Sequence, residues 1–254
     1  MSGAPFRSQS LRESIRRFSR IVKGVVLALL LVSGSAFAGD PWEFWPELDL
    51  YTRLGDTTRL YFVAAYAEGK ESEFQTLDLA AYFDLTFKPL QRKVTLIGKD
   101  EWREDQDWRR KRYAWARIGY DHVFKASGEV RSTPEDRGIV ALHGRAYLPA
   151  GFLFELRGRA DLRWIDDEYS TRYRLRGELN RDFTWLGHTS NVYLQAETFY
   201  DTRYDSWARQ LYQLGAEIML TKHFRAEPSV AWQYDRLPEE GGLWAFAIVA
   251  RWYY

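Results

Sequence analysis

The sequence predicts an all-β protein, a single antiparallel up-and-down β-barrel that crosses a membrane. The first observation is that segments of roughly ten residues with alternating apolar and polar side chains recur to the end of the chain, as expected for strands between lipid and a polar lumen. The second is that no segment after residue 38 has the run of about 20 apolar residues that a membrane helix needs. A mean hydropathy of -0.46 agrees with a barrel, because only every second residue of its strands meets lipid.

The stretch from Leu243 to Tyr254 (LWAFAIVARWYY) shows the alternation most clearly. One face is entirely apolar or aromatic and holds Trp244, Phe246, Ile248, Ala250, Trp252 and Tyr254. An edge strand of a soluble sandwich is the alternative, but it does not explain why the pattern recurs along the chain. We therefore expect a lipid-facing barrel strand here, and we expect the barrel assembly machinery to bind it.

The first 38 residues predict a cleavable signal peptide. A basic segment from Met1 to Lys23 precedes a short apolar run from Gly24 to Val32, and Ala36-Phe37-Ala38 matches a small-residue cleavage site. A retained membrane helix is the alternative, but the apolar run is about half the length that a membrane-spanning helix needs. We expect cleavage after Ala38, residues 39–254 as the barrel domain, and a location in the outer membrane of a Gram-negative bacterium.

Composition excludes several classes of site and partner. The chain has no cysteine, so disulfides, thiolate nucleophiles and cysteine-based metal centres are excluded. The first 38 residues hold six of the 36 Lys and Arg and one of the 35 Asp and Glu, so 30 basic and 34 acidic residues follow Ala38 and their net charge is -4. This balance gives no support to nucleic-acid binding. We expect no metal and no cofactor.

Twelve strands are expected, because an even number brings both ends of an antiparallel barrel to the same side of the membrane. They are Glu47 to Leu54, Arg59 to Glu68, Thr76 to Lys88, Lys93 to Lys99, Arg112 to Phe124, Gly138 to Leu148, Phe152 to Trp164, Thr171 to Asn180, Asn191 to Asp201, Tyr212 to Leu220, Phe224 to Asp235 and Leu243 to Tyr254. Ten strands, without Lys93 to Lys99 and the first strand, are the alternative. With twelve strands, the turns at Pro149 to Gly151 and Thr221 to His223 would be periplasmic. Pro228 lacks an amide donor and therefore predicts a local bulge in its strand.

Aromatic residues near the strand ends or on the outward face predict the two girdles that barrels place at the membrane interfaces. The residues are Trp45, Trp102, Trp164, Tyr169, Trp185, Trp207, Trp232, Trp244 and Trp252. We expect outer-membrane lipid and lipopolysaccharide to contact this outer wall.

The predicted lumen is rich in charge, above all in the hairpin of Phe152 to Trp164 and Thr171 to Asn180. Charge at the hydrocarbon midplane costs about 2 to 4 kcal/mol per Arg, so the charged positions must face inward. The predicted lining residues are Arg157, Arg159, Asp161, Arg163, Arg172, Arg174, Arg176 and Glu178, together with Glu197, Glu217 and Glu227 from later strands. Asp78 and Asp84 are inward by the same alternation.

A hairpin tip near Asp167 would set the register across this hairpin. It would place Arg163 opposite Arg172, Asp161 opposite Arg174, Arg159 opposite Arg176 and Arg157 opposite Glu178. Two interpretations of the charges stay open. In one, arginines and carboxylates form a network that fills a narrow barrel, and in the other the arginines form a water-filled track for anions.

The histidines give weak support for catalysis, and we expect no enzyme. His122 is outward near a strand end, His143 is inward beside Arg145, and His188 and His223 lie in turns. No serine in the predicted strands pairs with His122 or His143 as a nucleophile would require. An Asp-His pair near the loops is a weaker alternative.

The segments PWEFWPELDLY, RYRLRGELNRDF and LQAETFYDTRYDSWARQLYQLGAE resemble a family of Gram-negative outer-membrane barrel proteins of unknown function. The resemblance covers Trp42 to Tyr254, is most specific at Glu197 to Arg209, and departs from the family pattern from Pro89 to Arg110. It implies a barrel and an outer-membrane location, but no catalytic residues. In architecture the chain is also similar to twelve-stranded porins for acidic oligosaccharides, without a shared motif.

Three functional hypotheses follow. The first is a narrow channel for small anionic solutes through the arginine-rich lumen. The second is a non-conducting structural or interaction barrel that acts through extracellular loops at Lys125 to Arg137, Asp201 to Ser206 and Leu237 to Gly242. The third is an outer-membrane hydrolase that modifies lipid.

Overall fold

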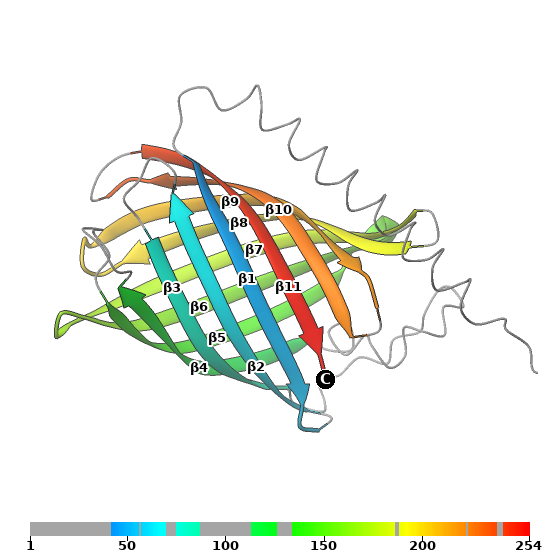
Figure 1. The fold of residues 1–254 in the computed structure, drawn as a ribbon, viewed down its shortest axis with the longest axis horizontal. Helices are drawn as coiled ribbons and strands as arrows, with labels where there is room; N and C mark the ends of the chain where they lie inside the picture. The colour runs from blue at the N-terminus through cyan, green and yellow to red at the C-terminus, as the bar shows by residue number, and fades with distance from the viewer. Residues whose placement is uncertain are drawn as a thin grey trace, which may run out of the picture. The chain divides into compact units, whose positions relative to one another are not determined.

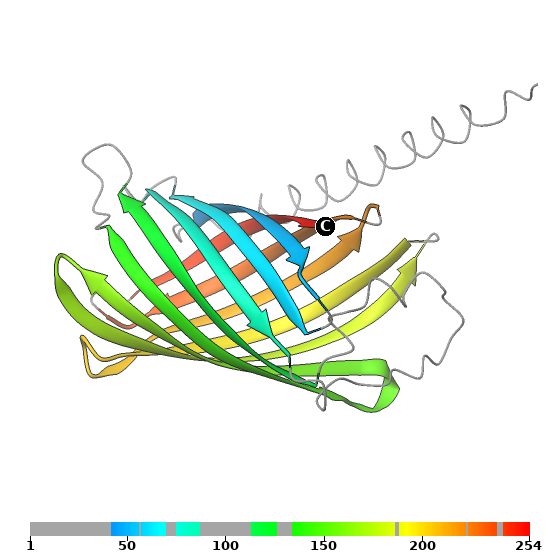
Figure 2. The same ribbon diagram turned by 90° about the horizontal axis from the view of Figure 1, so that it is seen from below.

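The protein forms a closed, all-β barrel (Figures 1 and 2). The computed structural model describes residues 42–55, 57–69, 75–86, 113–125, 134–185, 188–221, 223–237 and 241–254. The chain divides into Met1–Asp40 and Pro41–Tyr254, and the barrel belongs to the second unit. The predicted signal peptide lies outside the described residues.

Eleven strands make up the described barrel, and each pairs with its neighbours in sequence order. They are β1 (Trp42–Arg53), β2 (Thr58–Gly69), β3 (Gln75–Leu85), β4 (Ala114–Lys125), β5 (Glu135–Tyr147), β6 (Phe152–Ile165), β7 (Glu168–Trp185), β8 (His188–Asp201), β9 (Ser206–Met219), β10 (Phe224–Asp235) and β11 (Gly241–Tyr253). Within the described residues, no helix is long and apolar enough to cross a membrane.

The prediction of twelve strands is wrong, and so is the alternative of ten. β3 pairs directly with β4, from Thr76 opposite Lys125 to Leu85 opposite Ala116. The ring therefore has no place for Lys93 to Lys99 between these strands, and that segment lies outside the described residues. With eleven antiparallel strands the first and last run in the same direction, so β1 and β11 close the ring by parallel pairing.

The predicted inside-outside alternation is confirmed. Large apolar side chains are exposed on the outer wall, with Leu142 at 67% and Leu194 and Leu214 each at 58%. Their neighbours along the strands point inward, and buried charged residues such as Asp84, Asp161 and Glu197 are among them. The interior of this fold is thus rich in charged groups, with two small buried apolar clusters around Ile139 and Phe199, and the large hydrophobic surface lies outside.

Aromatic rings gather on the outer wall near both ends of the barrel. One group lies near the β6–β7 and β8–β9 turns, where Trp164 contacts Tyr169 and Tyr200 contacts Trp207. The other lies near the opposite end, where Trp252 contacts His223 and Phe224. The prediction for Trp45 is wrong, because its ring packs inside against a buried cluster and its indole N–H donates to Glu43. Trp102 and the side chain of Trp185 lie outside the described residues.

The β6–β7 hairpin has a tighter turn than the sequence suggested. Asp166 and Asp167 form a two-residue turn with φ angles of 51° and 66°, as in the left-handed turns that match strand twist. The predicted cross-strand pairs are therefore wrong by two residues: Arg163 lies opposite Ser170, Asp161 opposite Arg172, Arg159 opposite Arg174 and Arg157 opposite Arg176.

The bulge is also in another place. β10 keeps one register with β11 through Pro228, and Glu227 and Pro228 simply lack partners on β9. The register instead shifts between β8 and β9, at Phe199 and Tyr200. At Pro228, two positions of the β9–β10 ladder are therefore unpaired, but β10 gains no extra residue and forms no bulge there.

Candidate functional site: the charged lumen

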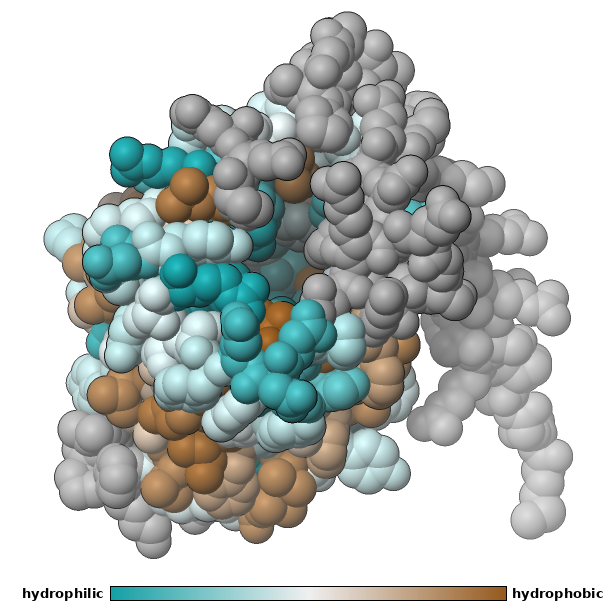
Figure 3. All heavy atoms as spheres, turned by 90° about the vertical axis from the view of Figure 1, so that its left-hand side faces the viewer, coloured by the Kyte–Doolittle hydropathy of each residue, from teal (hydrophilic) through white to brown (hydrophobic). Residues whose placement is uncertain are grey.

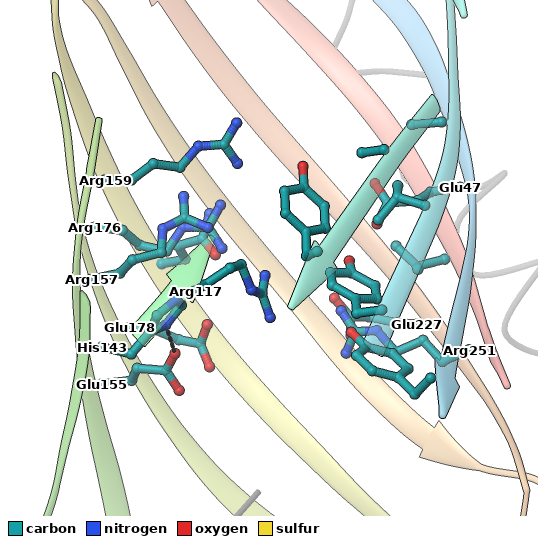
Figure 4. A pocket seen from close by; sticks show the side chains of 18 of the residues that line it. Glu47, Arg117, His143, Glu155, Arg157, Arg159, Arg176, Glu178, Glu227 and Arg251 are labelled. Carbon is teal, nitrogen blue, oxygen red and sulfur yellow. Dashed lines mark hydrogen bonds and ion pairs between the residues drawn. The ribbon is translucent and has the colours of Figure 1, made fainter. Parts of the chain in front are cut away.

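The barrel encloses a cavity of about 340 Å³, and its lining is dominated by charged and tyrosine side chains (Figure 4). We name the end with the β6–β7 and β8–β9 turns the loop end; it lies at the left of Figure 1. Seen from there, hydrophilic side chains surround a hollow, and hydrophobic residues lie on the outer wall below it (Figure 3). All eleven predicted lining residues are on inward positions of their strands, and seven of them line the cavity, namely Arg157, Arg159, Arg174, Arg176, Glu178, Glu217 and Glu227.

Glu197 binds three arginines of the hairpin. Its carboxylate accepts from Arg157 at 2.6 Å, Arg174 at 2.8 Å and Arg176 at 2.9 Å. Asp161 binds Arg159 and lies 3.7 Å from Arg174. Four arginines therefore share two carboxylates, and we call Arg157, Arg159, Arg174 and Arg176 the arginine wall.

The arginine wall exposes its guanidinium groups and hides the carboxylates that hold them. The side chains of Arg174 and Arg176 are 17% and 24% exposed, whereas that of Glu197 is fully buried. Such charge-assisted contacts fix an arginine without using all five of its donors. A solute in the cavity therefore meets the guanidinium groups of Arg174 and Arg176 on this side, with the carboxylates of Glu155 and Glu178 beside them (Figure 4).

The other predicted arginines lie toward the loop end. Arg163 binds Glu135 and, at 2.5 Å, Asp201, and Arg172 binds the same aspartate at 3.0 Å. Glu135 also accepts from Arg137 at 2.8 Å. Sequence reasoning missed Glu135 and Arg137, because the predicted strand began only at Gly138, although their alternation with Ile139 could have placed them.

The opposite side of the cavity is organised by Arg251. Its guanidinium binds Asp49 at 3.0 Å across the β1–β11 seam, Glu217 at 2.6 Å and Glu227. Arg225 also binds Glu217, at 2.5 Å. Here one arginine binds three carboxylates, whereas at Glu197 one carboxylate binds three arginines. The inward parity of Arg251 was visible in the sequence, but its partners depend on how the barrel closes.

Stacked tyrosines continue this side of the lumen across the seam. Tyr51 lies between Tyr253, with ring centroids 4.7 Å apart, and Tyr61, at 4.3 Å; Tyr82 follows Tyr61 at 5.2 Å. Arg117 lies over the ring of Tyr61, 4.7 Å from its centroid. The stacked rings cover one another's faces, and Tyr51, Tyr61 and Tyr82 line the cavity.

Asp84, an inward position of β3, joins β2 to β4. It binds Arg59 at 2.5 Å and Arg117 at 2.7 Å, and its side chain is fully buried. The same order recurs here: the carboxylate lies behind and an arginine reaches the cavity. Asp78, the other predicted acid on β3, binds Arg137 at 3.3 Å.

The two strand histidines lie on opposite sides of the wall, as predicted. His143 is inward: Nδ1 lies 3.1 Å from Glu155, and the ring stacks on Trp115 at 4.3 Å. His122 is outward, and its Nδ1 lies 2.6 Å from Asp136. His223 is in its predicted turn, whereas His188 begins β8. This geometry keeps His122 and His143 apart, and among the described residues no three or more His, Asp or Glu side chains are placed so that they could hold a metal ion.

Comparisons with models of protein families, with curated proteins and with solved structures found no match to this chain.

Proposed function

We propose that this chain is an integral β-barrel of a Gram-negative outer membrane and that small anionic solutes enter its lumen. The outer wall supports the membrane location, because exposed leucines cover it between two groups of aromatic rings. Lipid and lipopolysaccharide would contact this wall, and the barrel assembly machinery would engage β11. The barrel fold does not by itself indicate which solutes enter, so the proposed solute class rests on the residues of the lumen.

The observation that carries the proposal is the layering of charge in the lumen. Arginines face the cavity, while Glu197, Asp161 and Asp84 lie behind them with side chains no more than 2% exposed. Carboxylates in this position reduce the repulsion among arginines without covering their free donors. A passing anion would replace part of its hydration with these donors. Eleven strands lie between the filled eight-stranded barrels and the open barrels of about sixteen strands.

Planar-bilayer recording in a KCl gradient tests this proposal. We expect a small conductance whose reversal potential favours chloride. Arg176→Gln should reduce that preference, because Arg176 is the most exposed of the arginines on Glu197. Arg181→Gln is the matched control, because Arg181 lies over the rings of Phe152 and Phe183 and does not line the cavity. Silence from folded protein, or a preference for potassium, would refute the proposal.

A non-conducting barrel that acts through its loops is the second candidate, and the ion pairs near the loop end favour it. Arg163 there is only 5% exposed and joins Glu135 to Asp201, so it ties β6 to β5 and β8 across the inner surface. This function predicts bilayer silence. It also predicts that changes in the turn from Asp201 to Ser206 alter the phenotype, whereas changes in the arginine wall do not.

A lipid hydrolase is the third candidate, and only the outward His122–Asp136 contact favours it. Tyr120 also donates to Asp136, so three polar side chains meet on the outer wall. Turnover of phospholipid or lipid A that is lost in His122→Gln would support it.

A further inference from the structure

We infer that the lumen binds a dipolar solute, with an anionic group at one end and a protonated amine at the other. This inference rests on the proposed function and names the solute class for the same cavity. The inference rests on two parts of the lining: the arginine wall on β6 and β7, and the carboxyl group of Glu47 on β1. Both line the cavity of about 340 Å³.

The two groups lie on opposite sides of the barrel. Four strands separate β1 from β6 in one direction around the ring, and four separate β1 from β7 in the other, so no strands are farther from β1. Figure 4 shows Arg157, Arg159 and Arg176 on one side of the cavity and Glu47 on the other. A solute that bridges them would place one end at the arginine wall and the other end at Glu47.

The arginine wall suits a carboxylate, phosphonate or phosphate. Its four guanidinium groups are held by Glu197 and Asp161, so they are already oriented when a solute arrives. Planar guanidinium groups bind such anions through paired donors. Glu197 and Asp161 are buried, so these two carboxylates do not compete for the anion from the cavity side.

Glu47 suits a cation because the other acids near it are already occupied. Asp49 and Glu227 both bind Arg251, whereas no Lys or Arg among the described residues pairs with Glu47. Its side chain is half-buried, lines the cavity and lies two residues before Asp49 on the same inward face of β1. Two adjacent carboxyl groups repel each other when both are ionised, which favours a proton on one of them, and an ammonium group at Glu47 would take the place of that proton.

A purely anionic solute would use only half of this arrangement. It would satisfy the arginine wall but leave Glu47 facing it across the cavity. A dipolar solute satisfies both sides and adds no net charge to a confined space. The cavity volume is at the lower end of the range for small-molecule sites, which favours a short, unbranched molecule.

Equilibrium dialysis of the full chain in detergent, with radiolabelled 4-aminobutyrate and butyrate as probes, tests the inference. The probes share a carboxylate and a short chain, and only the first carries an amine. We expect 4-aminobutyrate to bind about fivefold more tightly, the effect of one partly hydrated ion pair. Glu47→Gln should reduce the ratio to about one and leave butyrate binding unchanged. Arg176→Gln should weaken both probes.

Glu168→Gln is the matched control, because Glu168 is an exposed residue at the start of β7 and does not line the cavity. Heat-modifiable gel mobility identifies folded variants, and retained butyrate binding shows that Glu47→Gln keeps the cavity intact. Equal affinity of the wild-type protein for both probes, or an unchanged ratio in Glu47→Gln, overturns the inference and leaves the anion pathway standing. Selective binding together with silent bilayers overturns the pathway and supports the site. Absence of binding by folded protein, with silent bilayers, overturns both.

Discussion

Two hubs of opposite charge organise the lumen, and they differ in how far their partners reach water. At Glu197 one fully buried carboxylate holds three arginines whose side chains are 8%, 17% and 24% exposed. At Arg251 one arginine holds three carboxylates that are at most 8% exposed. Glu197 therefore holds two arginines, Arg174 and Arg176, that are clearly exposed to the cavity, whereas the three acids around Arg251 expose little of their side chains, although Glu217 and Glu227 border the cavity.

The hubs also differ in what they join. Glu197 on β8 binds residues of β6 and β7, strands already linked to it through short turns. Arg251 on β11 binds Asp49 on β1, which is 202 residues away in sequence. The first hub shapes the surface of the cavity, and the second holds together a seam that no turn of the chain closes.

Loss of the Arg251 hub should have the largest effect. Arg251→Gln leaves Asp49, Glu217 and Glu227 without their shared cation, and side chains that are at most 8% exposed reach little water that could replace it. Breaking a buried charge network by removing one partner costs about 3 to 5 kcal/mol. We expect the free energy of unfolding to fall by that amount in urea titrations of detergent-solubilised protein, followed by tryptophan fluorescence.

Arg209→Gln is the control for this change. Arg209 binds Asp235 in a pair whose arginine side chain is 37% exposed, so its loss should cost less than about 1 kcal/mol. Equal effects of the two substitutions would show that the seam does not depend on Arg251.

Loss of the Glu197 hub should cost less. Glu197→Gln leaves three arginines close together, but Arg174 and Arg176 can turn toward water in the cavity. We expect a loss of about 2 kcal/mol in the same urea titration. In bilayers, we expect chloride selectivity to rise, because one negative charge is gone and three positive charges remain. A loss of stability as large as that of Arg251→Gln would contradict the difference in hydration between the hubs.

The alternation of side chains allowed the sequence to predict which residues face the lumen and which face outward. A charge cannot face lipid at low cost, so parity alone placed Arg157, Arg176, Glu197 and Glu227 inside. The same rule placed Arg251 inside, opposite the aromatic face of the last strand. Sidedness is local information, which each strand carries by itself.

Which inward side chains contact one another depends on residues far apart in the chain, and the sequence alone did not predict these contacts. Parity shows that Glu197 and Arg157 both point inward, but their contact depends on the two-residue turn at Asp166 and Asp167 and on the register it sets. The strand number depends on whether β3 meets β4, which are separated by a long segment without a clear turn signal. The partners of Arg251 in turn depend on the odd strand number, because only parallel closure places β1 beside it in this register.

The smallest expected loss of stability comes from a steric change, Gly215→Ala, which tests whether Tyr193 helps to hold Glu227 beside Arg251. A Cβ at Gly215 would lie 2.5 Å from the ring of Tyr193 and 2.8 Å from Ser229. The hydroxyl group of Tyr193 donates to Glu227 at 2.8 Å. Gly215→Ala should therefore move the ring and lengthen that hydrogen bond, at a cost of about 1 to 2 kcal/mol.

Gly158→Ala is the matched control, because a Cβ there meets nothing within 4 Å. It should leave the unfolding midpoint unchanged. Tyr193→Phe separates the two contributions of Gly215→Ala, since it removes the hydrogen bond and keeps the ring. If Gly215→Ala costs nothing beyond Gly158→Ala, Tyr193 does not hold Glu227 in place, and the hub depends on Arg251 alone.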